Sequence, residues 1–401
     1  MLSADQLLNE LLARARGVSE VEQVATDAVL GRVLAADQVS TITVPPLDNS
    51  AMDGYAVRAA ECLSDVVLPV SQRIAAGQVG QDLQPGTVAR IFTGAPVPPG
   101  ADAVVMQENC TVQGDDGITV NLAPRLGENI RRAGEDIQRG DVILATGTRL
   151  GAVEMGLAAS VGLAGLSVFR RLKVASFSTG DELVQPGMPL PAGQIYNSNR
   201  YTLAGLVQGL GCDWIDLGAV PDTLTDTIDA LQRAAQQADV VITSGGVSVG
   251  EEDHVKAAVS QLGTLDMWKV AMKPGKPLAY GRIGTADFIG LPGNPVSTFA
   301  TFCLFARPFL LMRMGATRVL PTVYQVRAAF DWAKLGDRRE FLRARLVNTD
   351  DGGLQAELFR NQSSGVLTSA VWADGFVDID IGCTVQRGAP VRFIPFAEVL
   401  G

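Results

Sequence analysis

The chain has 401 residues, which is long for one hydrophobic core, so we expect roughly two to four domains. Hydrophobic residues make up 47% and charged residues 19%, as in a folded globular protein, and the formal net charge of −10 argues against nucleic acid as the main partner. The five scattered cysteines indicate free thiols, and the single histidine, His254, excludes a histidine-rich metal site. Any bound metal would therefore be a hard cation such as Mg²⁺, held by carboxylate oxygens. The sequence has no apolar run of about 18 residues and no signal-peptide pattern, so we expect a cytoplasmic protein without a membrane span.

The first part of the chain has helical and β-rich patterns in turn. A helix is expected near residues 3–17, where a capping-box pattern opens an apolar face, and a second helix near 27–36. Between 41 and 140, short β-branched runs broken by glycine, proline and aspartate predict a β-rich segment. A helix of small residues is expected at 151–166, so the pattern indicates a β domain inserted between two parts of a helical one.

From residue 173 strands alternate with helices, which predicts a doubly wound α/β domain with a parallel sheet. The expected strands are 173–178, 214–220, 239–246, 277–283 and 286–291, and the expected helices are 201–211, 223–238 and 296–314. After Pro321 the runs are strand-like again, which indicates a C-terminal β domain. We therefore predict a multidomain α/β plus β protein with a split helical or linker domain at 1–44 and 140–172, an inserted β-rich domain at 45–139, an α/β domain at 173–320 and a C-terminal β domain at 321–401.

The strongest local signal is a glycine-rich turn that follows the buried strand at 239–246. Gly245, Gly246 and Gly250 would let the backbone approach a phosphate closely, with amide groups as donors. Asp253 then stands where a carboxylate could hold Mg²⁺ against that phosphate. A tight turn with a helix N-cap is the alternative, because the pattern matches neither the P-loop nor the dinucleotide-binding fingerprint.

Three other polar loops follow strands of the same predicted sheet. They contain Thr179, Gly180, Asp181 and Glu182, then Asp222, then Pro292, Gly293, Asn294, Pro295 and Ser297. Parallel strands end at one edge, so we expect these loops to converge on a crevice that binds a nucleotide or phosphate. Lys269, Lys273 and Lys276 lie in a proline-stiffened loop and are candidate partners of a phosphate or oxyanion, although a solvated basic loop is the alternative.

The β-rich segment also carries clustered polar residues, for which an Asx-rich turn is the alternative interpretation. The candidates are Asp48, Asn49, Ser50 and Asp53, then Thr93, and then Arg131, Arg132, Glu135 and Asp136. The C-terminal part adds Arg339, Arg343, Ser363 and Ser364.

Taken together, these segments resemble the MoeA family, which includes the E domain of gephyrin. The matching segments, in the family's order and approximate spacing, are PPLDNSAMDGYAV, TGAPVPPGAD, GENIRRAGEDI, STGDEL, GGVSVGEEDHVK, KPGKP and GLPGNPVS. The resemblance covers essentially the whole chain. It implies an elongated four-part subunit whose α/β domain is similar to the pterin adenylyltransferases, and a homodimer with the active site at the subunit interface.

The implied reaction is Mg²⁺-dependent cleavage of adenylyl-molybdopterin, with transfer of molybdate to the dithiolene and release of AMP. The resemblance places the site at Asp53, Thr93, Asp136, Glu182, Asp222, Asp253, Lys269, Lys273, Pro292, Pro295 and Ser364. Of these, the acids and the two lysines are the expected catalytic residues, and the expected Mg²⁺ ligands are Glu182, Asp222 and Asp253. Further substrate-binding candidates are Arg131, Thr179, Gly245, Gly246, Ser248, Gly250, Lys276, Gly293 and Asn294.

The implied partner contacts are equally specific. Asp53, Asp136 and Thr93 would come from the partner subunit to contact the pterin or the oxyanion. His254 stands where the family commonly has an aromatic residue, and we expect it to pack or to contact a phosphate edge. An upstream pterin adenylyltransferase and recipient molybdoenzymes are further possible partners.

Three alternatives remain open from the sequence. A stand-alone pterin adenylyltransferase would lack the residues before Lys173 and the β tail. A non-catalytic dimeric scaffold that binds the adenylated pterin should tolerate loss of the carboxylates, which are present here. A general nucleotide-binding protein is the remaining interpretation if the resemblance misleads.

Overall fold

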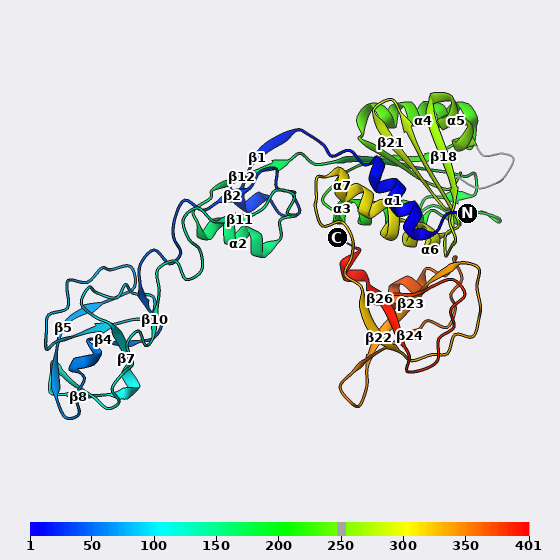
Figure 1. Cartoon of the computed structure of the whole chain (residues 1–401). Helices are drawn as coiled ribbons and strands as arrows, with labels where there is room; N and C mark the ends of the chain where they lie inside the picture. The colour runs from blue at the N-terminus through cyan, green and yellow to red at the C-terminus, as the bar shows by residue number, and fades with distance from the viewer. Residues whose placement is uncertain (247–253, 401) are drawn as a thin grey trace. The chain divides into compact units, whose positions relative to one another are not determined.

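The computed structural model describes residues 1–246 and 254–400 (Figure 1), and the predicted site residues Ser248, Gly250 and Asp253 lie outside the described residues. The contacts divide the chain into two compact units. The larger unit comprises Met1–Ala36, Gly147–Gly151 and Gly165–Gly401, and the smaller unit comprises Asp37–Thr146 and Ala152–Ala164. The predicted multidomain α/β plus β class is confirmed, whereas the finer division into four parts stays a prediction.

The smaller unit is built around a six-stranded sheet, as the β-branched runs predict. In the order in which they pair, its strands are β7 (Ala103–Met106), β4 (Gly54–Val57), β6 (Val88–Ile91), β5 (Val67–Ile74), β9 (Gly117–Val120) and β8 (Cys110–Gln113). Two short pairs accompany it, β3 (Asn49–Ser50) with β10 (Ile130–Arg131) and β2 (Gln38–Val39) with β11 (Val142–Leu144), together with helix α2 (Ala152–Ser160). Both faces of the sheet are buried, because Ala56 and Val57 are neighbours on β4 and each lies in a different hydrophobic cluster.

The larger unit contains a second six-stranded sheet. Its strands, in order, are β16 (Asp213–Val220), β13 (Lys173–Thr179), β17 (Val240–Ser244), β21 (Ala286–Leu291), β20 (Pro277–Ile283) and β18 (Gly263–Lys269). The first four strands are parallel, but β20 and β18 are antiparallel to their neighbours. The expectation of a wholly parallel sheet was therefore wrong at one edge. A tight turn with Gly284 at φ +58° joins β20 to β21 as a hairpin, which forces the antiparallel direction.

Helices cover both faces of this sheet. One face carries α1 (Ala4–Arg14), α3 (Ser198–Gly209), α6 (Pro295–Thr301) and α7 (Arg307–Arg313), and the other carries α4 (Leu224–Gln237) and α5 (His254–Leu262) (Figure 1). On β13, Val174 packs on the first face and Ala175 on the second, as the pleat of a strand requires. Because both faces are covered, the strands read as continuous apolar runs.

Helices α6 and α7 are joined by a π-helical turn, Phe302–Ala306, into one helix from Pro295 to Arg313, which confirms the helix predicted at 296–314. This helix is long and apolar enough to cross a membrane, with a mean hydropathy of 1.4, but 83% of its apolar window is buried inside the protein. It is therefore the central core helix of the larger unit.

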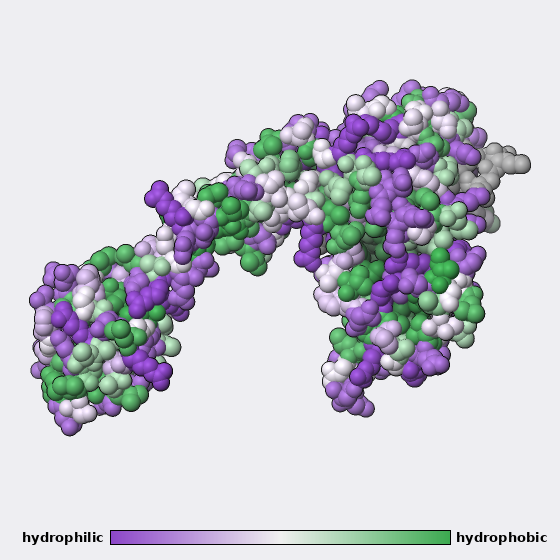
Figure 2. Space-filling view, viewed as in Figure 1, coloured by the Kyte–Doolittle hydropathy of each residue, from purple (hydrophilic) through white to green (hydrophobic). Residues whose placement is uncertain are grey.

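On the visible surface, hydrophobic residues appear in separate patches between hydrophilic ones (Figure 2).

The helix predicted near 27–36 was wrong. Only a short 3₁₀ turn, Thr26–Ala28, forms there, and Gly31 follows at φ +75°. Val33 then forms a β-bridge with Arg149, and Leu34 forms one with Val168, so tertiary pairing replaces the helix. Nearby, β1 (Val21–Ala25) pairs with β12 (Gly165–Phe169), which ends the predicted helix 151–166 early.

The C-terminal part forms a closed β structure. Strands β23 (Arg339–Asn348), β24 (Leu354–Leu358), β22 (Tyr324–Ala328), β26 (Pro390–Pro395) and β25 (Gly375–Ile379) pair in that order, and β25 pairs back with β23. A sixth strand, β19 (Met272–Lys273), joins β23 from the α/β part of the chain, and α8 (Thr368–Trp372) lies between β24 and β25 in sequence. The remaining pair is β14 (Leu183–Val184) with β15 (Ile195–Tyr196).

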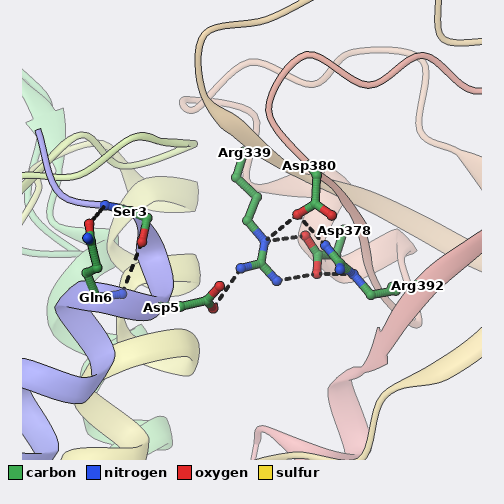
Figure 3. A network of polar contacts seen from close by, with 7 residues as sticks. All are labelled: Ser3, Asp5, Gln6, Arg339, Asp378, Asp380 and Arg392. Carbon is green, nitrogen blue, oxygen red and sulfur yellow. Dashed lines mark hydrogen bonds and ion pairs between the residues drawn. The ribbon is translucent and has the colours of Figure 1, made fainter.

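An ion-pair network anchors the beginning of β23 to helix α1 (Figure 3). Arg339 donates to both carboxylate oxygens of Asp378 at 2.7 and 2.6 Å and to Asp5 of α1 at 2.8 Å. Arg392 also donates to Asp378, at 2.9 Å. Asp378 is almost fully buried, and its hydrogen bonds raise the pKa of Arg339 above the ordinary value. The network therefore holds in place the beginning of β23, the strand that reaches the candidate functional site.

Candidate functional site

Loops at the carboxyl edge of the α/β sheet enclose two adjoining cavities. Cavity A has a volume of about 570 Å³ and is lined by Gly245, Gly246, Lys273, Pro274, Gly275, Lys276, Pro277, Pro292, Gly293, Asn294, Ser297, Arg338, Gln362, Ser363 and Ser364. Cavity B has a volume of about 360 Å³ and is lined by Thr179, Glu182, Leu183, Ile195, Tyr196, Asn197, Ser198, Asn199, Ser244, Gly245, Gly293, Asn294 and Pro295. The two share Gly245, Gly293 and Asn294, so they meet where β17 and β21 end.

The structure brings many of the sequence-predicted residues to these cavities. Those that line one or both are Thr179, Glu182, Gly245, Gly246, Lys273, Lys276, Pro292, Gly293, Asn294, Pro295, Ser297, Ser363 and Ser364. Lys269 lines neither cavity, because β18 ends at this residue and the chain runs through 270–272 before it reaches cavity A. Asp222 also lies outside both, in the exposed loop after β16. Their predicted roles stay predictions.

Glycines form the floor where the cavities meet. Gly245 has φ +93° and Gly246 has φ +67°, a region that residues with a Cβ rarely adopt. A Cβ at Gly246 would stand 2.4 Å from Cγ2 of Val255, so no side chain fits there. The backbone can therefore approach a bound group closely, as the glycine-rich pattern predicts.

Cations line one wall of cavity A. The Lys273 ammonium lies 3.5 Å from Oε2 of Glu340, and Lys276 is exposed. Arg338 adds a guanidinium, whose Nε lies 3.6 Å from Oδ1 of the exposed Asp337. These groups give the cavity positive charge suited to a phosphate or an oxyanion.

A loop from the C-terminal part closes cavity A, and a buried arginine supports it. Arg343 is fully buried and donates to Ser369 Oγ at 3.0 Å and to the Ser363 carbonyl at 3.1 Å. Gln362 exchanges hydrogen bonds with the Arg343 backbone, at 2.9 Å in each direction. Burial lowers the pKa of Arg343 to about 10. The Val296 N–H donates to the Ser364 carbonyl at 2.9 Å, which ties the loop to α6.

Sequence reasoning missed several lining residues. Arg338 and Gln362 line cavity A, and Asn197 and Asn199 line cavity B. Asn197 caps α3 through its side-chain oxygen, and Asn199 donates to the Gly293 carbonyl at 2.7 Å. The available signal was the short polar run NSNR after β15, which reads equally well as an ordinary helix cap.

Carboxylates lie beside cavity B. Glu182 lines it, and the Asp222 N–H donates to Asp181 Oδ1 at 3.5 Å, which brings the loops after β13 and β16 together. Among residues 1–246 and 254–400, no cluster of three or more acids, histidines or cysteines suited to a metal occurs, and all five cysteines are free. The predicted third ligand, Asp253, lies outside the described residues, so the metal set stays a prediction. The carboxylate oxygens that are present fit a hard cation such as Mg²⁺ by their chemistry.

In the smaller unit, two segments that are distant in sequence lie together. Asp48 accepts hydrogen bonds from Arg132 at 2.6 Å and from the Ala133 N–H at 2.8 Å. Ser50 pairs with Ile130 across β3 and β10. The sequence-predicted Asp–Asn–Ser loop and the arginine-containing loop therefore form one polar surface.

Asp53 and Thr93 also meet. The Thr93 N–H and hydroxyl donate to Asp53 Oδ1 at 2.7 and 2.8 Å, and these bonds, with the nearby charge of Arg90, hold the pKa of Asp53 below its ordinary value. Arg90 stacks on Phe92, 4.4 Å from the ring centre, and was not singled out from the sequence. Asp136 and Arg131 are exposed in the same unit, and their roles stay predictions.

Comparisons with known proteins cover the whole chain. A family model described as the MoeA N-terminal region (domain I and II) matches residues 2–162, one described as a probable molybdopterin binding domain matches 175–312, and one described as the MoeA C-terminal region (domain IV) matches 325–396. The sequence is 40% identical over 404 residues to a molybdopterin molybdenumtransferase of Haemophilus influenzae, with 100% of both chains covered. It is 33% identical to one of Bacillus subtilis, with 95% of this chain and 91% of the relative covered.

Solved structures agree with these matches. A structure described as a molybdopterin biosynthesis MoeA protein from Pyrococcus horikoshii aligns with a TM-score of 0.75 at 32% identity and covers 99% of each chain. A second structure of a MoeA protein from that organism aligns with a TM-score of 0.82 at 27% identity and covers 98% of this chain and 100% of the other.

Proposed function

This chain belongs to the MoeA family and is an enzyme of the molybdopterin molybdenumtransferase type, and from this premise we propose that it cleaves adenylyl-molybdopterin with Mg²⁺, inserts molybdate and releases AMP. Its place in molybdenum-cofactor biosynthesis and in molybdenum insertion follows from the family. Our proposal adds the cleavage of the pyrophosphate, its dependence on Mg²⁺ and the release of AMP.

The observation that carries this proposal is the junction of cavity A with cavity B. The substrate has two ring systems joined by a pyrophosphate, so it needs a cationic region next to a region that can hold a ring. Lys273, Lys276 and Arg338 supply cations in cavity A, and Tyr196 and the Asn197 amide lie along cavity B. The glycine turn between them lets backbone amides contact the phosphates.

In the proposed reaction the pyrophosphate link breaks and AMP leaves, and an oxygen of water completes the cleaved phosphate. The two dithiolene thiols bond to molybdenum, and their protons leave with one oxide of molybdate as water. Lys273 and Lys276 would bind and orient the oxyanion and offset the negative charge of the transition state. Glu182 and Asp222, with Asp253, would hold the Mg²⁺. When bound, this cation would polarise the pyrophosphate link.

We extend the proposal to a cytoplasmic homodimer in which the smaller unit of one subunit contributes to the site of the other. Support comes from the exposed polar surface of the smaller unit, where hydrogen bonds preorganise Asp53 with Thr93 and Asp48 with Arg132. An upstream pterin adenylyltransferase and recipient molybdoenzymes are the proposed partners. Molybdate and tungstate are both tetrahedral dianions, so the AMP release that each one stimulates can be compared in the same assay.

The first experiment measures AMP release from adenylyl-molybdopterin with and without molybdate and Mg²⁺, for the wild type and for Asp253→Ala. We expect release that depends on molybdate and Mg²⁺ and is lost in the variant. Undiminished, Mg²⁺-dependent turnover in the variant would remove Asp253 from the metal site. No release by the wild type, with tight nucleotide binding retained, would favour a scaffold. Sedimentation velocity on the same samples tests the homodimer.

A further inference from the structure

We propose that Glu340 is a positioning residue that fixes the ammonium of Lys273 at the wall of cavity A. The geometric part of this inference is independent of the reaction, whereas its catalytic consequence rests on the proposed function. Glu340 lines neither cavity and belongs to none of the sequence motifs.

Strand pairing brings the two residues together. Lys273 is the last residue of β19 and pairs in parallel with Glu340 of β23. The Lys273 Nζ lies 3.5 Å from Glu340 Oε2. The Arg339 N–H donates to the Ala271 carbonyl at 2.9 Å, so a backbone hydrogen bond holds the register next to the pair.

The burial of Glu340 makes the lysine its principal counter-charge. The Glu340 side chain is only 7% exposed, against 33% for Lys273, and Oε2 has no hydrogen-bond partner among the described residues. A buried carboxylate without a partner is strongly unfavourable, so a nearby cation must offset its charge. Arg343 lies three residues further along β23 and interacts with Glu340 at longer range, but no ion pair joins them in the part of the chain that the structure describes. Glu340 therefore holds the Lys273 ammonium close to β23.

The other cations of cavity A are held differently. Lys276 is exposed, and across residues 1–246 and 254–400 no carboxylate forms an ion pair with it. Arg338 forms an ion pair with the adjacent Asp337, whose side chain is 86% exposed. An exposed pair of this kind gives little fixation. Lys273 is thus the cation whose position the fold determines.

This arrangement suits a group that must meet an oxyanion in a fixed geometry. An ammonium has three donors, so one directed toward Glu340 leaves two for the oxyanion. Misplacing a reacting group by about 1 Å can cost about 100-fold in rate, so the tether matters for turnover. We expect Glu340 to act through Lys273 and not on the substrate.

The geometric part can be tested without substrate by acylating the native protein with an amine-reactive ester and reading each lysine by mass spectrometry. In the wild type we expect Lys273 to react several-fold more slowly than Lys276, its internal reference. Glu340→Gln should raise the Lys273 rate severalfold and leave the Lys276 rate unchanged. The matched control is Glu357→Gln, which breaks an exposed pair of 2.6 Å between Glu357 and Arg345 of the same strand and should change neither rate. Equal Lys273 rates in the wild type and Glu340→Gln would overturn the proposal.

The catalytic part is tested by a double-mutant cycle on AMP release. Glu340→Gln should lower kcat by about tenfold, which is less than the loss of about 100-fold that a displacement of about 1 Å can cause. The same substitution should have no further effect in a Lys273→Met background, because the residue through which it acts is already absent. If the losses of kcat in the two single variants add in the double variant, Glu340 does not act through Lys273 and has only a structural role. If the wild type itself releases no AMP, the proposed function fails, and the acylation rates still decide the geometric inference.

Discussion

The backbone N–H and the hydroxyl of Thr93 both donate to the same carboxylate oxygen of Asp53, at 2.7 and 2.8 Å. The same arrangement occurs a second time in the smaller unit, where Thr146 donates twice to Asp37, also at 2.7 and 2.8 Å. In both cases the threonine backbone bond is the largest cause that holds the aspartate pKa below its ordinary value. The two pairs are therefore locally equivalent, although only Asp53 belongs to a predicted site motif.

This equivalence allows a controlled test of Asp53. We expect Asp53→Asn to lower molybdate-dependent AMP release by about tenfold or more, because a charged group would be lost from the site. Asp37→Asn should leave the activity unchanged. Both variants replace a charged acceptor of two threonine hydrogen bonds with a neutral amide oxygen, so their thermal midpoints should fall by similar small amounts. Equal activity in the two variants would show that the Asp53 carboxylate is not used.

Gly275, in the wall of cavity A, offers a second test. It has φ +95°, and a Cβ there would stand 2.5 Å from Oγ1 of the buried Thr301. We expect Gly275→Ala to destabilise the protein by about 2 kcal/mol or more, from backbone strain and the clash together. Urea denaturation measures this loss, and AMP release should fall with it as the wall shifts.

The strain and the clash can be separated. Gly284 also has a positive φ, +58°, but a Cβ there meets nothing within 4 Å, so Gly284→Ala should cost only about 1 kcal/mol. The Thr301 hydroxyl has no hydrogen-bond partner among the described residues, so Thr301→Ala should relieve part of the Gly275→Ala defect. A Gly275→Ala variant as stable as Gly284→Ala would show that the wall adapts freely.

Elements with a long, regular pattern were the ones that the sequence predicted well. Strand β13 and helix α4 fall within a few residues of their predicted ranges, because continuous burial and an amphipathic period are properties of the segment itself. Strand β18 was missed because it lies at the sheet edge and its residues are half-buried or exposed. Its place depends on pairing with β20, which no local pattern encodes.

Some residues of the candidate site could likewise be predicted from the sequence, and others could not. Loops at strand ends were predictable, since parallel strands deliver them to one edge, and cavity A contains most of the glycine, proline and lysine candidates from those loops. Glu340 could not be found in this way, because its burial arises from the pairing of β23 with β19 and β25. Lys269 was included both for its place in the lysine-containing loop and from the family resemblance; it ends β18 and lines neither cavity, so its role stays a prediction.

The last prediction concerns acid stability at the opposite, amino end of the sheet. Asp239 precedes β17 and accepts two bonds from Arg170, at 2.7 and 2.8 Å, and one from the Lys173 N–H at 2.8 Å. Burial raises the pKa of this carboxyl, but the bonds from Arg170 and Lys173 outweigh it and hold the pKa below the ordinary value. A depressed folded-state pKa gives stability that is present above the unfolded pKa of about 4 and is lost as the pH falls through the lower folded value.

We therefore expect Asp239→Asn to lower the free energy of unfolding by about 2 kcal/mol at pH 7, less than for a fully buried pair because both side chains are about one-fifth exposed. The difference from the wild type should stay constant down to about pH 5 and shrink below about pH 4, where the wild-type carboxyl begins to take up its proton. Asp351→Asn, which breaks an exposed pair with Arg327 at 2.8 Å, is the control and should change stability little at either pH. Urea titrations of the three proteins at pH 7 and at pH 3.5 measure both effects. A gap between Asp239→Asn and the wild type that is as wide at pH 3.5 as at pH 7 would mean that the ionised carboxylate is not the source of the stability.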